Sequence, residues 1–229
     1  MEVLFNCNTT GFQSLGGGEV QLLKTKEYLD KNKISVKLFD QWKDKISDYD
    51  IVHNFGKSNN CYDVIHFAKL QNVKVALTPI YNWPSVKYSL NEVGNFRDKL
   101  KLLIYLSIKN NSMFNPLSKT KLIMNESDVI FVDSDQEASL LMKHFGVNKD
   151  KVKIIPVGVE KKFKNARPDL FIDKFRIKDF VLFVGRIDRR KNLLNLIKVV
   201  NKLNLPLVII GDKVIDQLPY YEECRKLAN

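Results

Sequence analysis

Cationic side chains gather in one short stretch late in the chain, FVGRIDRRKN. An apolar run, DFVLFVG, comes directly before Arg186, so the cations follow the carboxyl end of a predicted buried strand, where open α/β sheets bind their ligands. A guanidinium can hold two phosphate oxygens and an ammonium adds a point charge. Arg186 and Lys191 are therefore the candidates to bind a diphosphate and to stabilise it as a leaving group. Arg189 and Arg190 could be solvated cations, and the alternative for the whole loop is a basic surface that aids solubility.

A second candidate site is the run SLGGGEVQ near the amino terminus. Gly16, Gly17 and Gly18 follow a predicted strand and open a predicted helix. Glycine lets the backbone approach a ligand closely, and a helix N-terminus attracts phosphate. The spacing differs from the dinucleotide-binding G-x-G-x-x-G. The run therefore indicates either a phosphate-approaching loop or a flexible turn, and no dinucleotide cofactor.

The other residues that could do chemistry are sparse. His53 ends a predicted strand and could face a cleft, whereas His66 and His144 lie in predicted helices and are expected to be structural or exposed. The three cysteines are far apart in the chain. Neither a metal site, a disulfide framework nor a cofactor is predicted from this set.

The elements that must position these residues alternate between short apolar runs and helical patterns, which is typical of βαβ units and a mainly parallel sheet. Ser134 and Glu137 form a capping-box signature at one helix start. The predicted strands are Glu2–Cys7, Ile34–Phe39, Asp50–Phe55, Val73–Thr78, Asp128–Asp133, Val152–Gly158, Phe180–Val184 and Leu207–Ile210. Helices are predicted from the glycine run onward, at Tyr62–Gln71, after Ser134, at Leu193–Leu203 and from about Asp216. A further helical region, about Asn95–Asn125, is predicted to form two helices with a break before Pro116.

A charged, aperiodic segment at 158–179 predicts a linker between domains. Residues 1–157 would then form a Rossmann-like N-terminal domain, and residues 180–229 the start of a second one. Two strand–helix units bury too little surface for a complete two-faced sheet.

Length and charge limit the possible classes of function. The chain has 229 residues, 45% of them apolar, and a net charge of +11, which favours anionic partners. No nucleic-acid motif accompanies the charge, so nucleic-acid binding is not predicted. No signal peptide or spanning segment is visible, and a cytoplasmic location is expected. The basic segment Asn95–Lys121 could rest on the cytoplasmic face of an anionic membrane, or pack as a helix with a solvated basic face.

Several motifs, taken together and in their order along the chain, resemble those of retaining GT-B glycosyltransferases, the "glycosyl transferases group 1" (family 4). These motifs are GGGEVQLLKTKEYLDK, DIVHNFG, DVIFVDSDQEASLLMKHFG, IPVGVE and FVGRIDRRKN. The resemblance covers nearly the whole chain. It implies two Rossmann-like domains and metal-independent transfer of a sugar from a nucleotide-sugar to a hydroxyl of a glycan or glycolipid. It also implies that Arg186 and Lys191 hold the donor diphosphate, and that Gly16, Gly17 and Gly18 approach the donor phosphate and the acceptor.

The chain also departs from that family. Relatives often carry a histidine where this chain has Pro79–Trp83, so no catalytic residue is assigned. The family's E-x7-E motif would lie beyond Asn229, so the chain resembles a C-terminally truncated enzyme that alone is expected to be inactive. The alternatives are a non-catalytic acceptor-binding module, a module completed by a partner or by self-association, and a GT-B-like sugar-nucleotide epimerase.

Overall fold

The computed structural model describes residues 1–13, 15–81, 96–109 and 118–228. The chain divides into two compact units, Met1–Gly158 and Val159–Asn229. Each unit has its own parallel sheet, so the parallel α/β fold that the sequence predicts is confirmed. Within the described helices, no segment combines the length and the apolarity that crossing a membrane requires.

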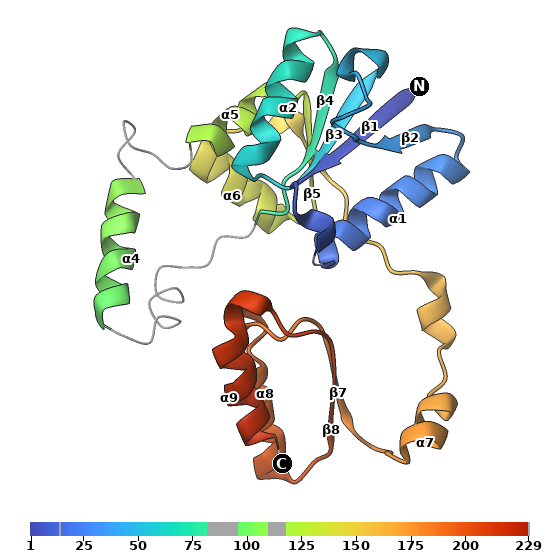
Figure 1. Ribbon diagram of the computed structural model, residues 1–229, viewed down its shortest axis with the longest axis vertical. Helices are drawn as coiled ribbons and strands as arrows, with labels where there is room; N and C mark the ends of the chain where they lie inside the picture. Colours follow the sequence, from blue (N-terminus) through green and yellow to red (C-terminus); the bar gives the residue numbers. More distant parts are fainter. Residues whose placement is uncertain (14, 82–95, 110–117, 229) are drawn as a thin grey trace. The chain divides into compact units, whose positions relative to one another are not determined.

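The N-terminal unit is built on a six-stranded parallel sheet with the order β2-β1-β3-β4-β5-β6 (Figure 1). Its strands coincide with the predicted ones to within a few residues at each end. They are β1 (Glu2–Cys7), β2 (Ser35–Leu38), β3 (Ile51–Phe55), β4 (Lys74–Thr78), β5 (Val129–Val132) and β6 (Val152–Ile154).

The helices of this unit follow the strands in the predicted alternation. The helices are α1 (Gly17–Lys31), α2 (Asn59–Leu70), α4 (Phe96–Lys109), α5 (Ser118–Glu126) and α6 (Asp135–Phe145), with short 3₁₀ helices at Gly11–Gln13, Ile46–Asp48 and Lys149–Lys151. The described parts of the basic segment form α4 and α5, and Pro116, before which a break is predicted, lies outside the described residues.

The two faces of this sheet are covered unequally. On one face, strand residues such as Leu4, Val52 and Leu77 form the main core with α2, α5 and α6. On the other face, a smaller core around Phe5 and Leu22 packs under α1. Parallel strands are normally buried on both faces. Beside α1, however, an apolar groove of about 430 Å³ runs along the strands.

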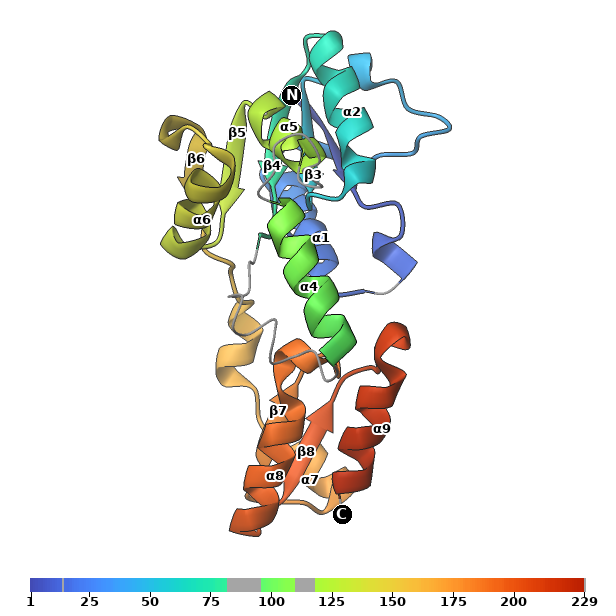
Figure 2. The ribbon, with the colours of Figure 1, turned by 90° about the vertical axis from the view of Figure 1, so that its left-hand side faces the viewer.

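The C-terminal unit is smaller. Its two parallel strands pair residue by residue, and α8 and α9 pack side by side against one face of them (Figure 1 and Figure 2). Exposed Leu182, Val184 and Ile210 line the other face. The elements are α7 (Asp169–Phe175), β7 (Val181–Val184), α8 (Leu193–Leu203), β8 (Leu207–Ile210) and α9 (Leu218–Leu227), with 3₁₀ helices at Lys161–Asn165, Arg189–Lys191 and Ile215–Gln217. The segment 158–179, predicted as an aperiodic linker, thus contains a 3₁₀ helix and α7.

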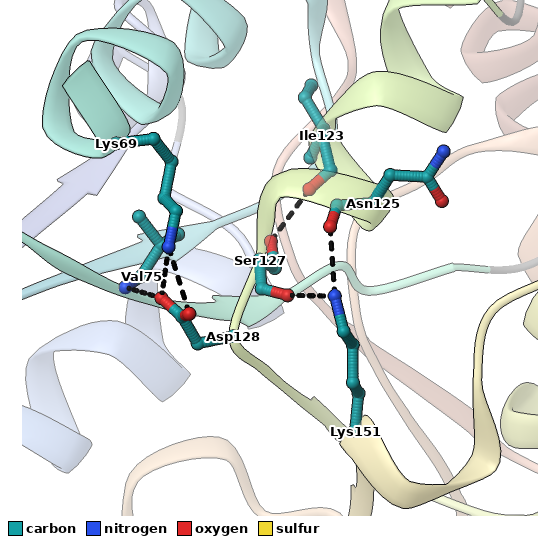
Figure 3. Close-up of polar contacts among 7 residues, drawn as sticks. All are labelled: Lys69, Val75, Ile123, Asn125, Ser127, Asp128 and Lys151. Carbon is teal, nitrogen blue, oxygen red and sulfur yellow. Dashed lines mark hydrogen bonds and ion pairs between the residues drawn. The ribbon is translucent and has the colours of Figure 1, made fainter. Parts of the chain in front are cut away.

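Asp128 ties three elements together where β5 begins (Figure 3). Its carboxylate accepts hydrogen bonds from the Lys69 ammonium of α2 at 2.9 Å and from the Val75 backbone N–H of β4 at 2.8 Å. Burial raises the pKa of Asp128, but Lys69 and the Val75 N–H together outweigh burial, so the net pKa lies below its usual value. The carboxylate therefore stabilises the fold in its ionised form.

Lys151 closes the same corner of the sheet. Its ammonium donates to the backbone carbonyl oxygens of Asn125 at 2.9 Å and Ser127 at 3.0 Å, and the Ser127 hydroxyl donates to the Ile123 carbonyl (Figure 3). A cation at a helix C-terminus satisfies carbonyl groups that have no partner within the helix. These bonds fix the passage from α5 into β5.

The Asp128 bonds predict a pH-dependent loss of stability in Asp128→Asn. At neutral pH the variant should lower the free energy of unfolding by about 1 kcal/mol, because it loses the ion pair with Lys69. The contribution of a carboxylate with a lowered pKa is present above its unfolded pKa and is lost as pH falls through its folded pKa. Urea unfolding at neutral pH and near pH 3 should therefore show the difference from wild type shrinking in acid. Asp63→Asn, on the exposed side of α2, is the control. An equal difference at both pH values would contradict the assignment.

Candidate functional site

The carboxyl ends of β7 and β8 meet through two glycines. Gly185 and Gly211 both have φ near +150°, at +153° and +152°, a region that side chains rarely adopt. A Cβ at Gly211 would lie 1.9 Å from the Gly185 carbonyl oxygen, so the two loops touch backbone to backbone. Beyond the strands, the Ile187 N–H donates to the Asp212 carbonyl at 2.9 Å. The backbone that leads into Arg186 is thus fixed on both sides.

Asp188 builds the turn that carries the cations. Its side chain is almost fully buried, and one carboxylate oxygen accepts the Lys191 backbone N–H at 3.2 Å. The other oxygen pairs with Arg190 at 3.1 Å. The carboxylate therefore caps the 3₁₀ helix Arg189–Lys191, after which Asn192 in the left-handed region begins α8. Sequence reasoning did not assign Asp188, although an aspartate three residues before a turn N–H is a capping signal.

Arg189 is also engaged within the unit. Its guanidinium lies 5.0 Å from the ring centroid of Tyr220, a cation–π contact, and its backbone N–H donates to Gln217 at 2.9 Å. Tyr220 is buried, and its hydroxyl accepts the Leu194 N–H at 3.0 Å. From the sequence, Arg189 and Arg190 could be solvated cations. In the structure Arg189 contacts Tyr220 of α9, and Arg190 pairs with Asp188 within the turn.

Arg186 and Lys191 differ from these two arginines. Arg186 is half-buried and follows Gly185 directly. The Lys191 Cε lies 4.0 Å from the place of a Cβ at Gly185, so its side chain reaches back to the strand end. Among the residues that the structure describes, neither cation forms an ion pair. Two uncommitted cations therefore flank the glycine at the end of β7.

In the N-terminal unit the glycine run forms the start of α1. Gly16 is the N-cap and its N–H donates to the Glu19 side chain at 2.8 Å, while Gly17 opens the helix. A Cβ at Gly18 would lie 2.9 Å from the Ile80 Cδ1, so the helix start packs closely on the loop after β4. The run therefore lies at the carboxyl edge of the sheet, between β1 and α1.

His53 has little exposed surface. It is buried beside Phe55, with ring centroids 4.3 Å apart, and its Nε2 lies 2.9 Å from the Thr78 hydroxyl oxygen. It also lines the apolar groove beside α1. Burial lowers the pKa of His53 to about 3, so the ring is neutral at physiological pH.

The other two histidines make contacts within the unit. The partly exposed His66 lies 3.2 Å from the Glu126 carboxylate, and the His144 Nδ1 lies 2.8 Å from the Tyr81 hydroxyl oxygen. These contacts agree with a structural interpretation of both rings.

The predicted capping box forms only in part. The Ser134 hydroxyl accepts the Glu137 N–H at 3.3 Å, but the Glu137 carboxylate accepts the N–H groups of Asp133 and Tyr81 instead of that of Ser134. Tyr81 closes the described part of Pro79–Trp83, because residues 82 and 83 lie outside the described range. Glu137 thereby ties the loop after β4 to the start of α6.

No family model matches the chain, and no curated protein does. Similar solved structures include HepE from Anabaena in complex with UDP, with 13% identity, a TM-score of 0.62, and coverage of 99% of this chain and 65% of that one. A glycosyltransferase from Rickettsia africae has 14% identity, a TM-score of 0.59, and coverage of 99% and 64%. The UDP-GlcNAc 2-epimerase from Neisseria meningitidis, bound to UDP-GlcNAc, has 12% identity, a TM-score of 0.52, and coverage of 100% and 69%.

The chain has a glycosyltransferase-like fold. Its Rossmann-like α/β architecture matches the GT-B type that the sequence resembles. The chain spans 65% and 64% of the length of the first two of these structures. With sequence identities of 13%, 14% and 12%, the similarity establishes the fold alone.

The neutral His53 predicts a specific loss of stability in acid. A base whose folded pKa lies below its unfolded value of 6.5 costs stability as pH falls from 6.5 toward 3, because only the unfolded chain takes up the proton. Wild type should lose about 2 kcal/mol more than His53→Gln between pH 7 and about pH 4.5. Thermal unfolding at both pH values measures this, with the partly exposed His66→Gln as the control. A wild-type loss no larger than that of His53→Gln would refute a buried neutral ring.

Proposed function

We propose that this chain belongs to a metal-independent, retaining glycosyltransferase of the family-4 type, which transfers a sugar from a nucleotide-sugar to a hydroxyl acceptor. The observation that carries the proposal is the pair Arg186 and Lys191, two cations without ion-pair partners in the described structure, beside Gly185 at a strand end. Arg189 and Arg190 carry the same charge but are engaged with Tyr220 and Asp188. The uncommitted cations suit the two phosphates of a donor.

The proposed chemistry concentrates on the leaving group. The bond between the anomeric carbon and the diphosphate oxygen breaks, and negative charge develops on that oxygen. Arg186 and Lys191 stabilise this charge where a metal ion would otherwise do so. The acceptor hydroxyl attacks the same face of the sugar and passes its proton to the departing phosphate oxygen, so a protein nucleophile is not required.

The glycine run has the matching role on the N-terminal unit. The Gly16 N–H is taken by Glu19, whereas Gly17 and Gly18 place the first backbone N–H groups of α1 at the carboxyl edge of the sheet, and helix N-termini favour phosphate oxygens. Gly18 permits the close approach of this helix start to Ile80. We assign this loop to the donor phosphate and the acceptor.

Binding of UDP tests the diphosphate assignment. Arg186→Ala and Lys191→Ala should each weaken UDP binding about 10- to 100-fold in calorimetry, because each removes a charge-assisted contact to phosphate. Arg225→Ala removes the same charge from an exposed position on α9 of the same unit and should change the affinity by no more than about twofold. Equal affinities for wild type and Arg186→Ala would remove the phosphate role.

A sugar-nucleotide epimerase is the second candidate, because one of the similar structures is such an enzyme. It would use Arg186 and Lys191 for the same diphosphate. The products separate the two functions, since transfer consumes an acceptor hydroxyl and epimerisation changes only the sugar of the donor.

We also propose that α4 contacts an anionic membrane surface. Leu100, Leu103 and Ile104 are exposed and lie on one side of the helix, at the i, i+3 and i+4 spacing. The cations Arg97 and Lys101 lie near the edge of this apolar stripe. Apolar side chains flanked by cations are typical of helices that lie in the interface of anionic bilayers.

Vesicle sedimentation tests the membrane contact. The wild-type protein should sediment with phosphatidylcholine vesicles that contain phosphatidylglycerol, and much less with phosphatidylcholine alone. The double variant Leu100→Ser, Ile104→Ser should reduce binding about tenfold or more, because each exposed aliphatic side chain contributes on the order of 1 kcal/mol or more when buried. Leu170→Ser, at an exposed position of α7, is the control. Binding that the double variant retains would rule out α4 as the contact.

A further inference from the structure

Lys57 is a half-buried cation at the carboxyl end of β3, directly after Gly56. Its ammonium lies 5.2 Å from the ring centroid of Tyr81, which packs in the core of the N-terminal unit. Burial lowers the pKa of Lys57, and no charged neighbour contributes to the shift. Within the described part of the chain, no carboxylate pairs with this ammonium.

The turn that presents Lys57 is held by a buried polar network. The Asn6 side-chain amide donates to the Asn54 side-chain oxygen at 2.7 Å, and the Asn54 amide donates to the Gly56 carbonyl at 2.9 Å. The Gly56 N–H donates to the Thr78 carbonyl at 2.8 Å, and Gly56 has a φ of +93°. Three neighbouring strands thus fix the backbone just before Lys57.

Tyr81, under the ammonium, is fixed as well. Its ring is buried, its backbone N–H donates to the Glu137 carboxylate, and its hydroxyl oxygen lies 2.8 Å from the His144 Nδ1. A lysine on a fixed backbone and above a fixed ring has lost much of the freedom that an ordinary surface lysine keeps. Partial burial of a cation without a carboxylate partner costs free energy, which an anionic ligand would offset.

We propose that Lys57 binds an anionic group, a phosphate or a carboxylate, on the acceptor molecule. Open parallel sheets bind ligands at the carboxyl ends of their strands, and Lys57 lies at that edge. The ring of Tyr81 offers an apolar surface beside the charge, which suits a group that joins an anion to a sugar or a lipid. That the anion belongs to an acceptor molecule rests on the proposed function. The anion site itself rests on Lys57 and its surroundings.

Lysine-specific NMR tests the site in the whole chain. Reductive methylation with ¹³C-formaldehyde labels each lysine and keeps its charge, and Lys57→Arg identifies the Lys57 resonance without changing the net charge. Titration with inorganic phosphate and with glucuronate should shift this resonance to saturation at millimolar concentration, while neutral glucose should not. Lys153, exposed on β6, is the control resonance, identified by Lys153→Arg, and should shift far less.

The result also separates this proposal from the diphosphate assignment. In an Arg186→Ala, Lys191→Ala background the Lys57 shift should persist although UDP no longer binds. A response to phosphate alone would indicate a phosphorylated acceptor, and a response to glucuronate alone an acidic sugar. No saturable shift, equal shifts at Lys57 and Lys153, or an equal response to glucose would overturn the proposal.

Discussion

The strands of a parallel sheet are committed to their hydrogen-bonded neighbours, so the loops at their carboxyl ends are the places left to bind a ligand, and both units of this chain follow that constraint. In the C-terminal unit, β7 ends at Val184, Arg186 follows Gly185, and the Lys191 side chain reaches back to that glycine. In the N-terminal unit, the glycine run and Gly56 lie beyond β1 and β3. The buried interiors determine where these loops begin, and the loops differ in the charges that they present.

The cationic side chains of the chain fall into two groups: those that stabilise the fold through pairs and hydrogen bonds, and those that we propose to bind ligands. The chain carries a net charge of +11, yet many of its cations are engaged. Lys69 holds Asp128, Lys151 holds the end of α5, and Arg190 holds the capping carboxylate of Asp188. The cations that we propose to bind ligands are ones left out of such pairs. A net charge by itself would not identify them.

Much of the fold could be predicted from the sequence, because short apolar runs and amphipathic stretches give strong local signals. β1, α8 and β8 begin and end where the patterns place them. The roles of individual polar residues were harder to predict, since they depend on contacts between distant segments. Glu137 has the spacing of a capping box, but the nearby backbone N–H of Tyr81 takes one of its oxygens. The engagement of Arg189 depends on Tyr220 in another helix, which no local spacing reveals.

The contact between Gly185 and Gly211 has a consequence for how such a chain can vary over evolution. The atom that a Cβ at Gly211 would meet is a main-chain oxygen, so no exchange of a neighbouring side chain could make room for it. Even alanine there would push the two loops apart and move Arg186 with them. Substitution of Gly211 should therefore be poorly tolerated among descendants of this sequence, although this residue bears no charge and no functional group.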